Sequence, residues 1–204
     1  MVKKADIPRH IVATAIGLAA TQGWRDTTLS DIAAAAKLTL AEVHGHYRSK
    51  AAILAAFSRQ IDAAVLAGDD PELADQPAAD RLFDVLMRRF DALSPHKAGV
   101  RAILGDSLGD PFALVSGACA LECSMSWMLA AARIESSGLG GSLRVKGLAA
   151  IYLAVLRVWL ADDSDDMATT MAALDKRLRQ VDAALAALGR LSRPGRARGA
   201  TESA

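Results

Sequence analysis

The sequence has few of the residues that build disulfide scaffolds, zinc sites or aromatic clusters. Only two of its 204 residues are cysteines, and only 4% are aromatic. Cys119 and Cys123 stand four apart in an apolar run, without a CxxC spacing or a neighbouring group of histidines that would hold zinc. We therefore expect reduced thiols in the core of a cytosolic protein, and no disulfide.

The motifs of catalysis are also missing. The histidines show no metal-binding spacing, no GxSxG elbow surrounds a serine, and no glycine loop of phosphate-binding form occurs. His44 and His46 lie two residues apart, so on a helix they point in different directions. The sequence therefore predicts a protein that is not an enzyme, with no catalytic residue, no cofactor and no metal ion.

Signals for export or membrane insertion are weak. The start, MVKKADIPRH, turns polar after two residues and lacks the apolar centre of a secretion signal, so we expect a cytoplasmic protein. Residues 112–132 and 145–160 are apolar, but Glu122 interrupts the first run and Lys146 and Arg157 interrupt the second. Charged groups are costly inside a bilayer, so we expect two buried helices and no transmembrane segment.

The residues that are abundant favour helix. Hydrophobic residues make up 52% of the chain, alanine is frequent, and runs of β-branched residues are rare. We predict an all-α protein of about nine helices. It divides into a helix-turn-helix head at 1–50, a helical body at 51–191 and a disordered basic tail at 192–204, because the tail lacks apolar periodicity.

Positive charge gathers at the N-terminal end, although the net charge of the chain is only +1. The first 60 residues hold eight lysines and arginines against four acids, so the rest of the chain is net negative. This distribution indicates contact between the N-terminal end and a polyanion.

Start and stop signals in the head predict two short helices between two longer ones. The first helix begins at Asp6 and Pro8 and ends near Gly23. The next three begin at cap residues, which are Thr28, Thr39 and Ser49. Glu42 stands three residues after Thr39 and completes a capping box. Two short helices joined by a tight turn form a helix-turn-helix unit.

The body follows a boundary at 68–80, where glycine, two prolines and five acids occur together. The sequence predicts helices at 79–93, 96–108, 110–134, 142–161 and 165–189. The last two helices carry a narrow apolar seam, which we expect two copies to join into the four-helix interface of a homodimer. A seam closed within one chain is the alternative. The interface residues would be Leu148, Tyr152, Val155, Met167, Met171, Leu174, Leu178, Val181 and Leu185.

Apolar side chains of the middle helices form a predicted pocket for a small apolar ligand or lipid. Its apolar lining would be Phe83, Met87, Phe90, Leu104, Phe112, Met125, Met128 and Trp159. Glu122 and Ser126 lie four apart on one helix and would orient the ligand. An ordinary core and a solvent-facing polar stripe are the alternatives for these two groups.

Residues 7–54 hold, in order, GW, TTL, DIAAAA and HGHYRSK just before AAIL. This order resembles the N-terminal domain of TetR-type transcriptional regulators. The resemblance implies a homodimer whose third helices enter successive major grooves of a double-stranded DNA operator, and a ligand that shifts the spacing of the two heads. By position, Thr28 and Lys50 would hold phosphates, Thr39, Leu40, Ala41, Glu42, His44 and His46 would face bases, and Tyr47 would anchor the helix to the core.

Four positions depart from the usual run of that family. Lys37 stands in place of glycine, Leu40 of lysine, Glu42 of threonine and His44 of tyrosine. A carboxylate turned toward phosphates opposes DNA binding, but it can also accept a hydrogen bond from a cytosine amino group. As the alternative, Glu42 is a helix cap.

The second domain resembles a different protein of the same fold. The segments RLFDVLMRRF and KGLAAIYLAVLRVWL are similar to the lipid-binding accessory protein of ubiquinone biosynthesis. That resemblance implies binding of an isoprenoid lipid, association with a hydroxylase, a membrane-touching C-terminal helix and no DNA binding. The tail of this chain cannot form such a helix. A DNA-binding regulator is therefore the first interpretation, and the lipid-binding helper is the alternative.

Overall fold

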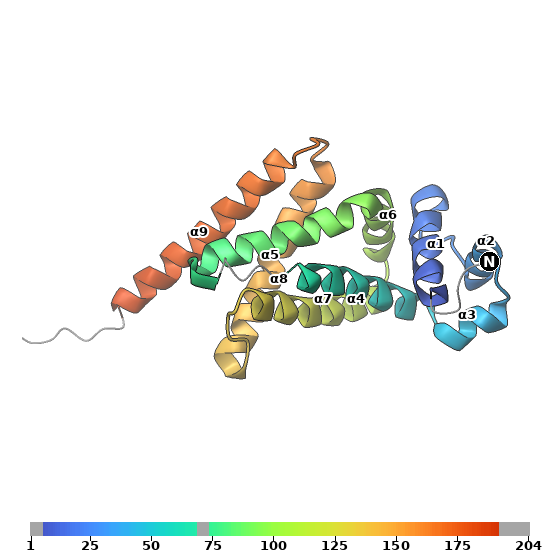
Figure 1. Cartoon of the computed structure of the whole chain (residues 1–204), viewed down its shortest axis with the longest axis horizontal. Coiled ribbons are helices and arrows are strands. Elements are labelled where there is room, and N and C mark those ends of the chain that lie inside the picture. Colours follow the sequence, from blue (N-terminus) through green and yellow to red (C-terminus); the bar gives the residue numbers. More distant parts are fainter. Residues whose placement is uncertain (1–5, 69–73, 192–204) are drawn as a thin grey trace, which may run out of the picture.

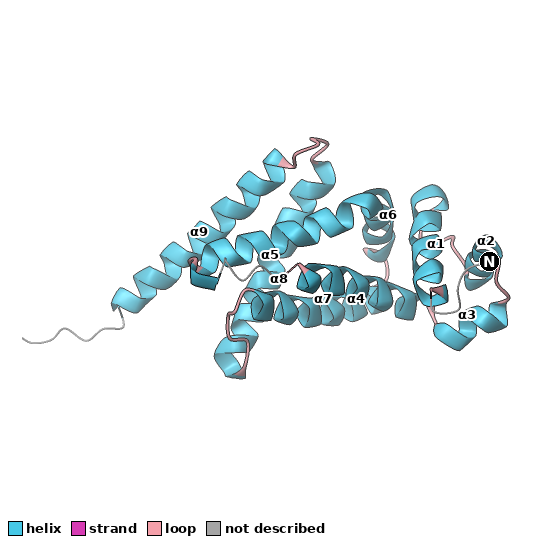
Figure 2. Ribbon diagram, in the orientation of Figure 1, coloured by secondary structure: helices cyan, strands magenta, loops and turns pink. Residues whose placement is uncertain are grey.

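The computed structural model describes residues 6–68 and 74–191, with the backbone alone for 184–191. Over these residues the chain forms helices α1 to α9 and no strand, as the composition predicts (Figures 1 and 2). The head lies at one end of an elongated body (Figure 1). The basic tail expected at 192–204 lies outside the described residues.

Three helices form the head around a small apolar core. They are α1 (Ile7–Gln22), α2 (Leu29–Ala36) and α3 (Leu40–His46). Ile11, Ile32 and Val43, one from each helix, are completely buried in this core. The side chain of His10 also joins α1 to α2, with 3.1 Å between its Nε2 and the carbonyl oxygen of Ala36.

The predicted cap residues begin the helices as expected. Thr28 accepts a hydrogen bond from the Asp31 amide at 3.1 Å, and the Asp31 carboxylate accepts one from the Thr28 amide at 2.8 Å. Ser49 accepts from the Ala52 amide at 3.1 Å. These bonds pair amides that the first turn of a helix otherwise leaves free. The local sequence therefore determines where these helices start.

Helix α4 (Lys50–Ala67) is shared between head and body. Its Ile53 and Ala56 are buried in the head core, whereas Ile61 and Val65 are buried in the body core. The boundary that we expect at residue 50 therefore falls at the first residue of a helix that packs in both cores.

The body contains five further helices. They are α5 (Ala78–Leu93), α6 (Lys97–Ser107), α7 (Pro111–Ala131), α8 (Gly138–Ala161) and α9 (Ala168–Leu191). The 3-10 turn η2 (Ser94–His96) joins α5 to α6. Phe90 of α5 lies between two rings of α8, with 5.4 Å between its centroid and that of Tyr152 and 5.8 Å to that of Trp159. This aromatic cluster is the centre of the body core.

Helix α8 begins at Gly138, four residues before the predicted start at 142. The glycines of this segment favour a loop, but a Cβ on Gly141 would lie 2.0 Å from the carbonyl carbon of Ser136. Glycine is therefore required because the preceding chain folds back onto the first turn of the helix.

Helix α7 differs from the expectation of a buried apolar helix. It is long and apolar enough to cross a membrane by length and composition, yet only 22% of its most apolar window is buried in the protein. Its first half faces outward, and both Cys119 and Cys123 are exposed, so the prediction of core thiols is wrong. Only its second half, with Met125 and Met128, enters the core.

A group of polar side chains that includes a charge pair is buried between four helices of the body. Arg89 of α5 donates a hydrogen bond to the Asp62 carboxylate of α4, and the Ser124 hydroxyl of α7 donates to the same carboxylate. The guanidinium carbon of Arg89 lies 5.4 Å from the centre of the Tyr152 ring of α8. These four side chains thus connect four helices through one buried charge pair.

Candidate nucleic-acid interface

Helix α3 presents most of its side chains to solvent at the outer end of the head (Figure 1). The only buried residue of the helix is Val43, which points into the head core. All five helix residues that the resemblance predicts to face bases are exposed, namely Leu40, Ala41, Glu42, His44 and His46. The structure therefore brings this part of the predicted site onto one accessible surface.

Tyr47 anchors the end of α3 and does not belong to that surface. Its ring is buried in the head core, and its hydroxyl lies 3.3 Å from the carbonyl oxygen of Pro8, to which it donates. Burial raises the pKa of this phenol. Its side chain joins α3 to α1, which agrees with the anchoring role that the resemblance implies.

Thr39 and Glu42 form a complete capping box. The Thr39 amide donates to the Glu42 carboxylate at 2.7 Å, and the Glu42 amide donates to the Thr39 hydroxyl at 3.2 Å. The hydrogen bonds from the Thr39 amide and hydroxyl lower the pKa of Glu42, so the carboxylate stays ionised at neutral pH. The cap role of Glu42 is thus observed, and a negative charge lies at the start of the candidate reading helix.

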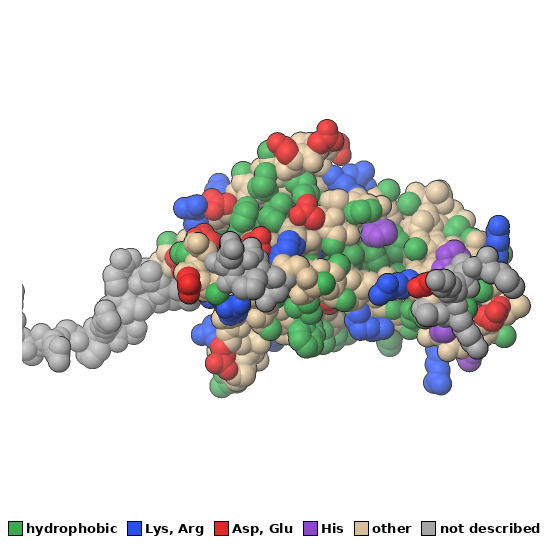
Figure 3. Space-filling model, viewed as in Figure 1, with side chains coloured by type: hydrophobic (Ala, Val, Ile, Leu, Met, Phe, Trp, Pro, Cys, Tyr) green, Lys and Arg blue, Asp and Glu red, His purple; other side chains and the backbone are tan. Residues whose placement is uncertain are grey.

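Two basic residues flank α3. Lys37 lies in the turn before the helix, Arg48 lies just after it, and both are exposed. In Figure 3 separate basic side chains are visible at the upper and lower edges of the head at the right-hand end. The sequence analysis did not include Arg48 in the site. Its position directly after the predicted reading helix of a basic head could have identified it. Residues 37–48 thus carry two cations and one carboxylate.

Lys37 has a left-handed backbone, with φ of 57°, and ends α2. A side chain in this conformation costs about 1–2 kcal/mol relative to glycine, which has no Cβ to clash. We expect Lys37→Gly to raise the free energy of unfolding by roughly 0.5–1 kcal/mol. The gain is smaller than the full conformational cost because glycine also has more freedom in the unfolded chain. Thermal unfolding measures this; a lower melting temperature would show that Lys37 makes a compensating contact.

Lys50 is half-buried at the start of α4 and is engaged within the chain. Its ammonium donates to the carbonyl oxygen of Trp24 and, at 3.4 Å, to that of Arg25, and it lies 4.6 Å from the centre of the Trp24 ring. Burial lowers the pKa of this ammonium. Lys50 therefore fastens α4 to the loop between α1 and α2, in addition to any contact with phosphate. Thr28 of the same loop region is exposed and caps α2.

The residues predicted to line a ligand pocket do not meet around a cavity. Phe90, Met125, Met128 and Trp159 are completely buried and form part of the body core, with Phe83, Met87 and Leu104 packed beside them. Phe112 and Glu122 are exposed on α7. Ser126 donates to the Cys123 carbonyl of its own helix at 2.7 Å. This arrangement corrects the predicted pocket, because its residues divide between core and surface.

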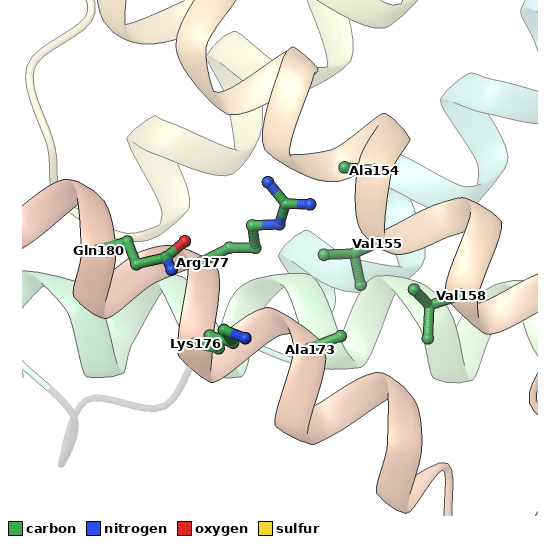
Figure 4. A pocket seen from close by; sticks show the side chains of 7 residues that line it. All are labelled: Ala154, Val155, Val158, Ala173, Lys176, Arg177 and Gln180. Carbon is green, nitrogen blue, oxygen red and sulfur yellow. The ribbon is translucent and has the colours of Figure 1, made fainter.

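A groove of about 360 Å³ lies instead between α8 and α9 (Figure 4). Valines of α8 form its apolar wall, and two cations and an amide of α9 form its polar wall. Its lining residues are Ala154, Val155, Val158, Ala173, Lys176, Arg177 and Gln180. Arg177 extends from α9 toward α8 in Figure 4. Such a lining suits a molecule with an apolar part and an anionic group.

The predicted dimer seam closes within a single chain. Leu148, Tyr152 and Val155 of α8 are buried, as are Leu174 and Leu178 of α9. Met167 packs against the same core, Met171 is half-buried, and Val181 is exposed, while the Leu185 side chain lies outside the described residues. These buried residues therefore join α8 to α9 within one chain, and the contact between two copies stays a prediction.

Comparison with known proteins agrees with both resemblances seen in the sequence. Residues 11–57 match the model of the family described as bacterial regulatory proteins, tetR family. Residues 144–184 match the COQ9 family model. A search of curated protein sequences gives no match.

Solved structures match almost the whole chain. A TetR transcriptional regulator from Nitrosomonas europaea has 24% identity and a TM-score of 0.71, covering 86% of this chain and 97% of its own. One from Rhodococcus sp. RHA1 has 16% identity and a TM-score of 0.64, covering 88% and 97%. FadR of Thermus thermophilus, a TetR-family repressor solved with lauroyl-CoA, has 20% identity and a TM-score of 0.59, covering 95% and 100%. The chain therefore has the fold of TetR transcriptional regulators, and its head matches their family model.

Proposed function

We propose that this protein is a cytoplasmic, homodimeric transcriptional regulator of TetR type that binds a double-stranded DNA operator and responds to a small, largely apolar ligand. The observation that carries the proposal is the exposed face of α3. It sits on a head that matches the tetR family model over residues 11–57.

The head has the parts that a helix-turn-helix needs. The capping box at Thr39 sets the start of α3, and Val43 and Tyr47 hold its inner side, so the exposed side chains have a defined direction. Lys37 and Arg48 supply positive charge for phosphates on both sides of the helix. The short, largely apolar or neutral reading face then selects sequence, while the cations supply affinity.

The groove between α8 and α9 supports a ligand of amphiphilic type. Val155 and Val158 would contact an apolar chain, and Lys176 and Arg177 would pair with an anionic group. The structure of Thermus thermophilus FadR with lauroyl-CoA shows that a protein of this fold binds a molecule with both parts. We propose a ligand of that class for this chain, bound more tightly by one arrangement of the heads than by the other, so that it shifts the equilibrium between them.

The lipid-binding helper function has narrower support. The COQ9 match covers only residues 144–184, which correspond to α8 and the first part of α9. The head match and the solved structures described above favour a regulator. The regulator is therefore the proposal, and the helper is an outcome of its test.

Fluorescence anisotropy with labelled genomic DNA fragments, repeated across a salt series, tests the proposal. We expect one fragment to bind above the others, with an affinity that falls steeply as salt increases because bound phosphates release counterions. If no fragment binds above background at low salt while long-chain isoprenoids copurify with the protein, the helper function replaces the regulator.

Glu42→Gln separates the charge of this residue from its cap role. Glutamine preserves the capping box, so α3 keeps its start, but the repulsion between carboxylate and phosphates disappears. We expect affinity for nonspecific DNA to rise about three- to tenfold at low salt, and to rise further in Glu42→Lys. Anisotropy on a scrambled duplex measures the change.

The specific fragment distinguishes two roles of the carboxylate. If Glu42 only opposes binding, Glu42→Gln strengthens specific and nonspecific binding together. If it accepts a hydrogen bond from a cytosine, specific binding falls while nonspecific binding rises. Equal affinity of the variant and the native protein for both duplexes would show that α3 does not approach DNA.

A further inference from the structure

Both cysteines of the chain are exposed on helix α7. Cysteine is among the residue types that proteins most often bury, yet the side chains of Cys119 and Cys123 face solvent, and neither forms a disulfide. The sequence contains no other cysteine. Core packing therefore does not account for the presence of these two thiols.

The two thiols lie on one face of α7. Residues four apart are neighbours on the surface of a helix, with about 5–6 Å between their Cβ atoms. Helix α7 is continuous from Pro111 to Ala131, so this spacing applies to Cys119 and Cys123. The turns before and after them on the same face carry Val115 and Trp127, which are also exposed. The pair is therefore accessible to a small ligand from solvent.

The spacing disfavours a disulfide between the two thiols while α7 stays helical. A disulfide holds its Cβ atoms about 3.5–4.5 Å apart, which is closer than the helix places them. Closing the bond would require α7 to unwind locally. A single metal ion between the sulfurs removes this conflict, because two metal–sulfur bonds of about 2.3 Å each span up to roughly 4.6 Å.

We propose that Cys119 and Cys123 form a two-thiolate binding site for one soft, monovalent metal ion of the Cu(I) class. Thiolate sulfur is a soft ligand, and soft ligands select Cu(I) in proteins. Binding replaces two S–H bonds by two S–metal bonds, so one monovalent cation and two thiols give a complex of charge −1 and release two protons. No electron is transferred. The site requires neither the reading helix nor DNA, and so goes beyond the proposed regulator function.

The surroundings of the pair favour an ion with two ligands over zinc. A structural zinc ion takes four ligands. Within residues 6–68 and 74–191, no three side chains of histidine, cysteine, aspartate or glutamate gather where they could hold a metal ion. Cu(I) needs fewer ligands, and two thiolates suit it.

The charge beside the pair favours a cation. Glu122 is the single charged residue of α7, and its side chain is exposed. It stands three residues after Cys119, so its carboxylate lies close to the face that carries the thiols. An exposed carboxylate attracts a cation and repels an anion, although water and salt weaken both effects. The pair therefore suits a metal cation better than an anionic thiol reagent.

Anaerobic titration of the full-length protein with Cu(I), buffered by a coloured Cu(I) chelator, tests the proposal. We expect the protein to take one ion per chain from the chelator, and both thiols to stop reacting with a disulfide reagent once the ion is bound. Two ions per chain, or one ion for two chains, would contradict a site made by the two thiols of one chain. Thiols that do not react before the ion is added would also contradict it, because the site must be open to solvent.

A spacing variant keeps two thiols and changes only their separation. In Cys123→Ser/Ser126→Cys the thiols stand seven residues apart, which is about 10 Å along a helix and too far for one ion to bridge. We expect the affinity for Cu(I) to fall at least about 100-fold, because each thiol then binds alone. Circular dichroism checks that the helices persist. Equal affinity of the native protein and the spacing variant would show that the native thiols act singly, and would overturn the site.

Competition with Zn(II) tests the class of ion. We expect the native protein to keep its Cu(I) in about a tenfold excess of Zn(II). Displacement of Cu(I) by Zn(II) would contradict the assignment of a soft, monovalent ion. The titrations contain no DNA, so a protein that binds Cu(I) but no DNA fragment contradicts the regulator alone, and one that binds DNA but no Cu(I) contradicts this site alone.

Discussion

Replacing Asp62 by alanine is expected to lower the free energy of unfolding by about 3–5 kcal/mol. Its carboxylate is the partner of the buried Arg89 guanidinium and also accepts a hydrogen bond from Ser124. Without it, a cation remains in the core with no opposite charge, and its Nε already lacks a partner. Urea unfolding followed by circular dichroism measures the loss.

In Asp62→Ala, loss of a proton from Arg89 does not easily remove the destabilisation caused by its buried charge. Burial by itself lowers its pKa, but Tyr152 and Asp62 more than compensate, so the pKa is raised and the guanidinium stays charged. Removing both charges together avoids the penalty. The double variant Asp62→Ala/Arg89→Met is therefore expected to recover most of the stability lost in the single variant.

A surface pair offers the matched control. Asp84 and Arg88 form an ion pair within α5, with 2.8 Å between carboxylate and guanidinium, at the partly exposed edge of the body. Asp84→Ala is expected to cost less than about 1 kcal/mol, because solvent screens the pair. Equal losses in Asp62→Ala and Asp84→Ala would show that the buried pair is hydrated and does not stabilise the body.

The second large effect concerns the contact between head and body. A Cβ on Gly99 of α6 would lie 2.6 Å from both the Cγ2 and the carbonyl oxygen of Ile16 in α1. Gly99→Ala must therefore push α1 away from α6, and we expect a loss of roughly 1–3 kcal/mol. Because this contact sets the position of the head on the body, affinity for the specific DNA fragment is expected to fall as well.

Gly105→Ala is the control on the same helix. A Cβ at Gly105 would meet no atom within 4 Å, so alanine is expected to stabilise α6 by about 0.5–1 kcal/mol and to leave DNA binding unchanged. Thermal unfolding and anisotropy of the two variants are compared directly. If both Gly99→Ala and Gly105→Ala increased the free energy of unfolding, the close packing of α1 on α6 would not limit the size of the residue at position 99.

The local sequence determined the elements of the head. Thr28, Thr39 and Ser49 begin helices as predicted, because a cap bond joins residues only three apart and needs no other part of the chain. The same signals identified Glu42 as part of the capping box of α3. The helices of the body and most of their boundaries were also predictable from the sequence, because helical periodicity depends on residues close together in the chain.

Only the tertiary structure decided which faces meet and which stay open. The apolar seam at Leu148 and Leu174 predicted that α8 and α9 are covered by other helices. The pattern does not show which helix covers them, and the structure packs the two helices on each other within one chain. Phe112 and Cys119 read as core because α7 is apolar on all sides. Their exposure depends on how α4, α5 and α8 surround only its second half, a contact between residues distant in sequence that no local pattern records.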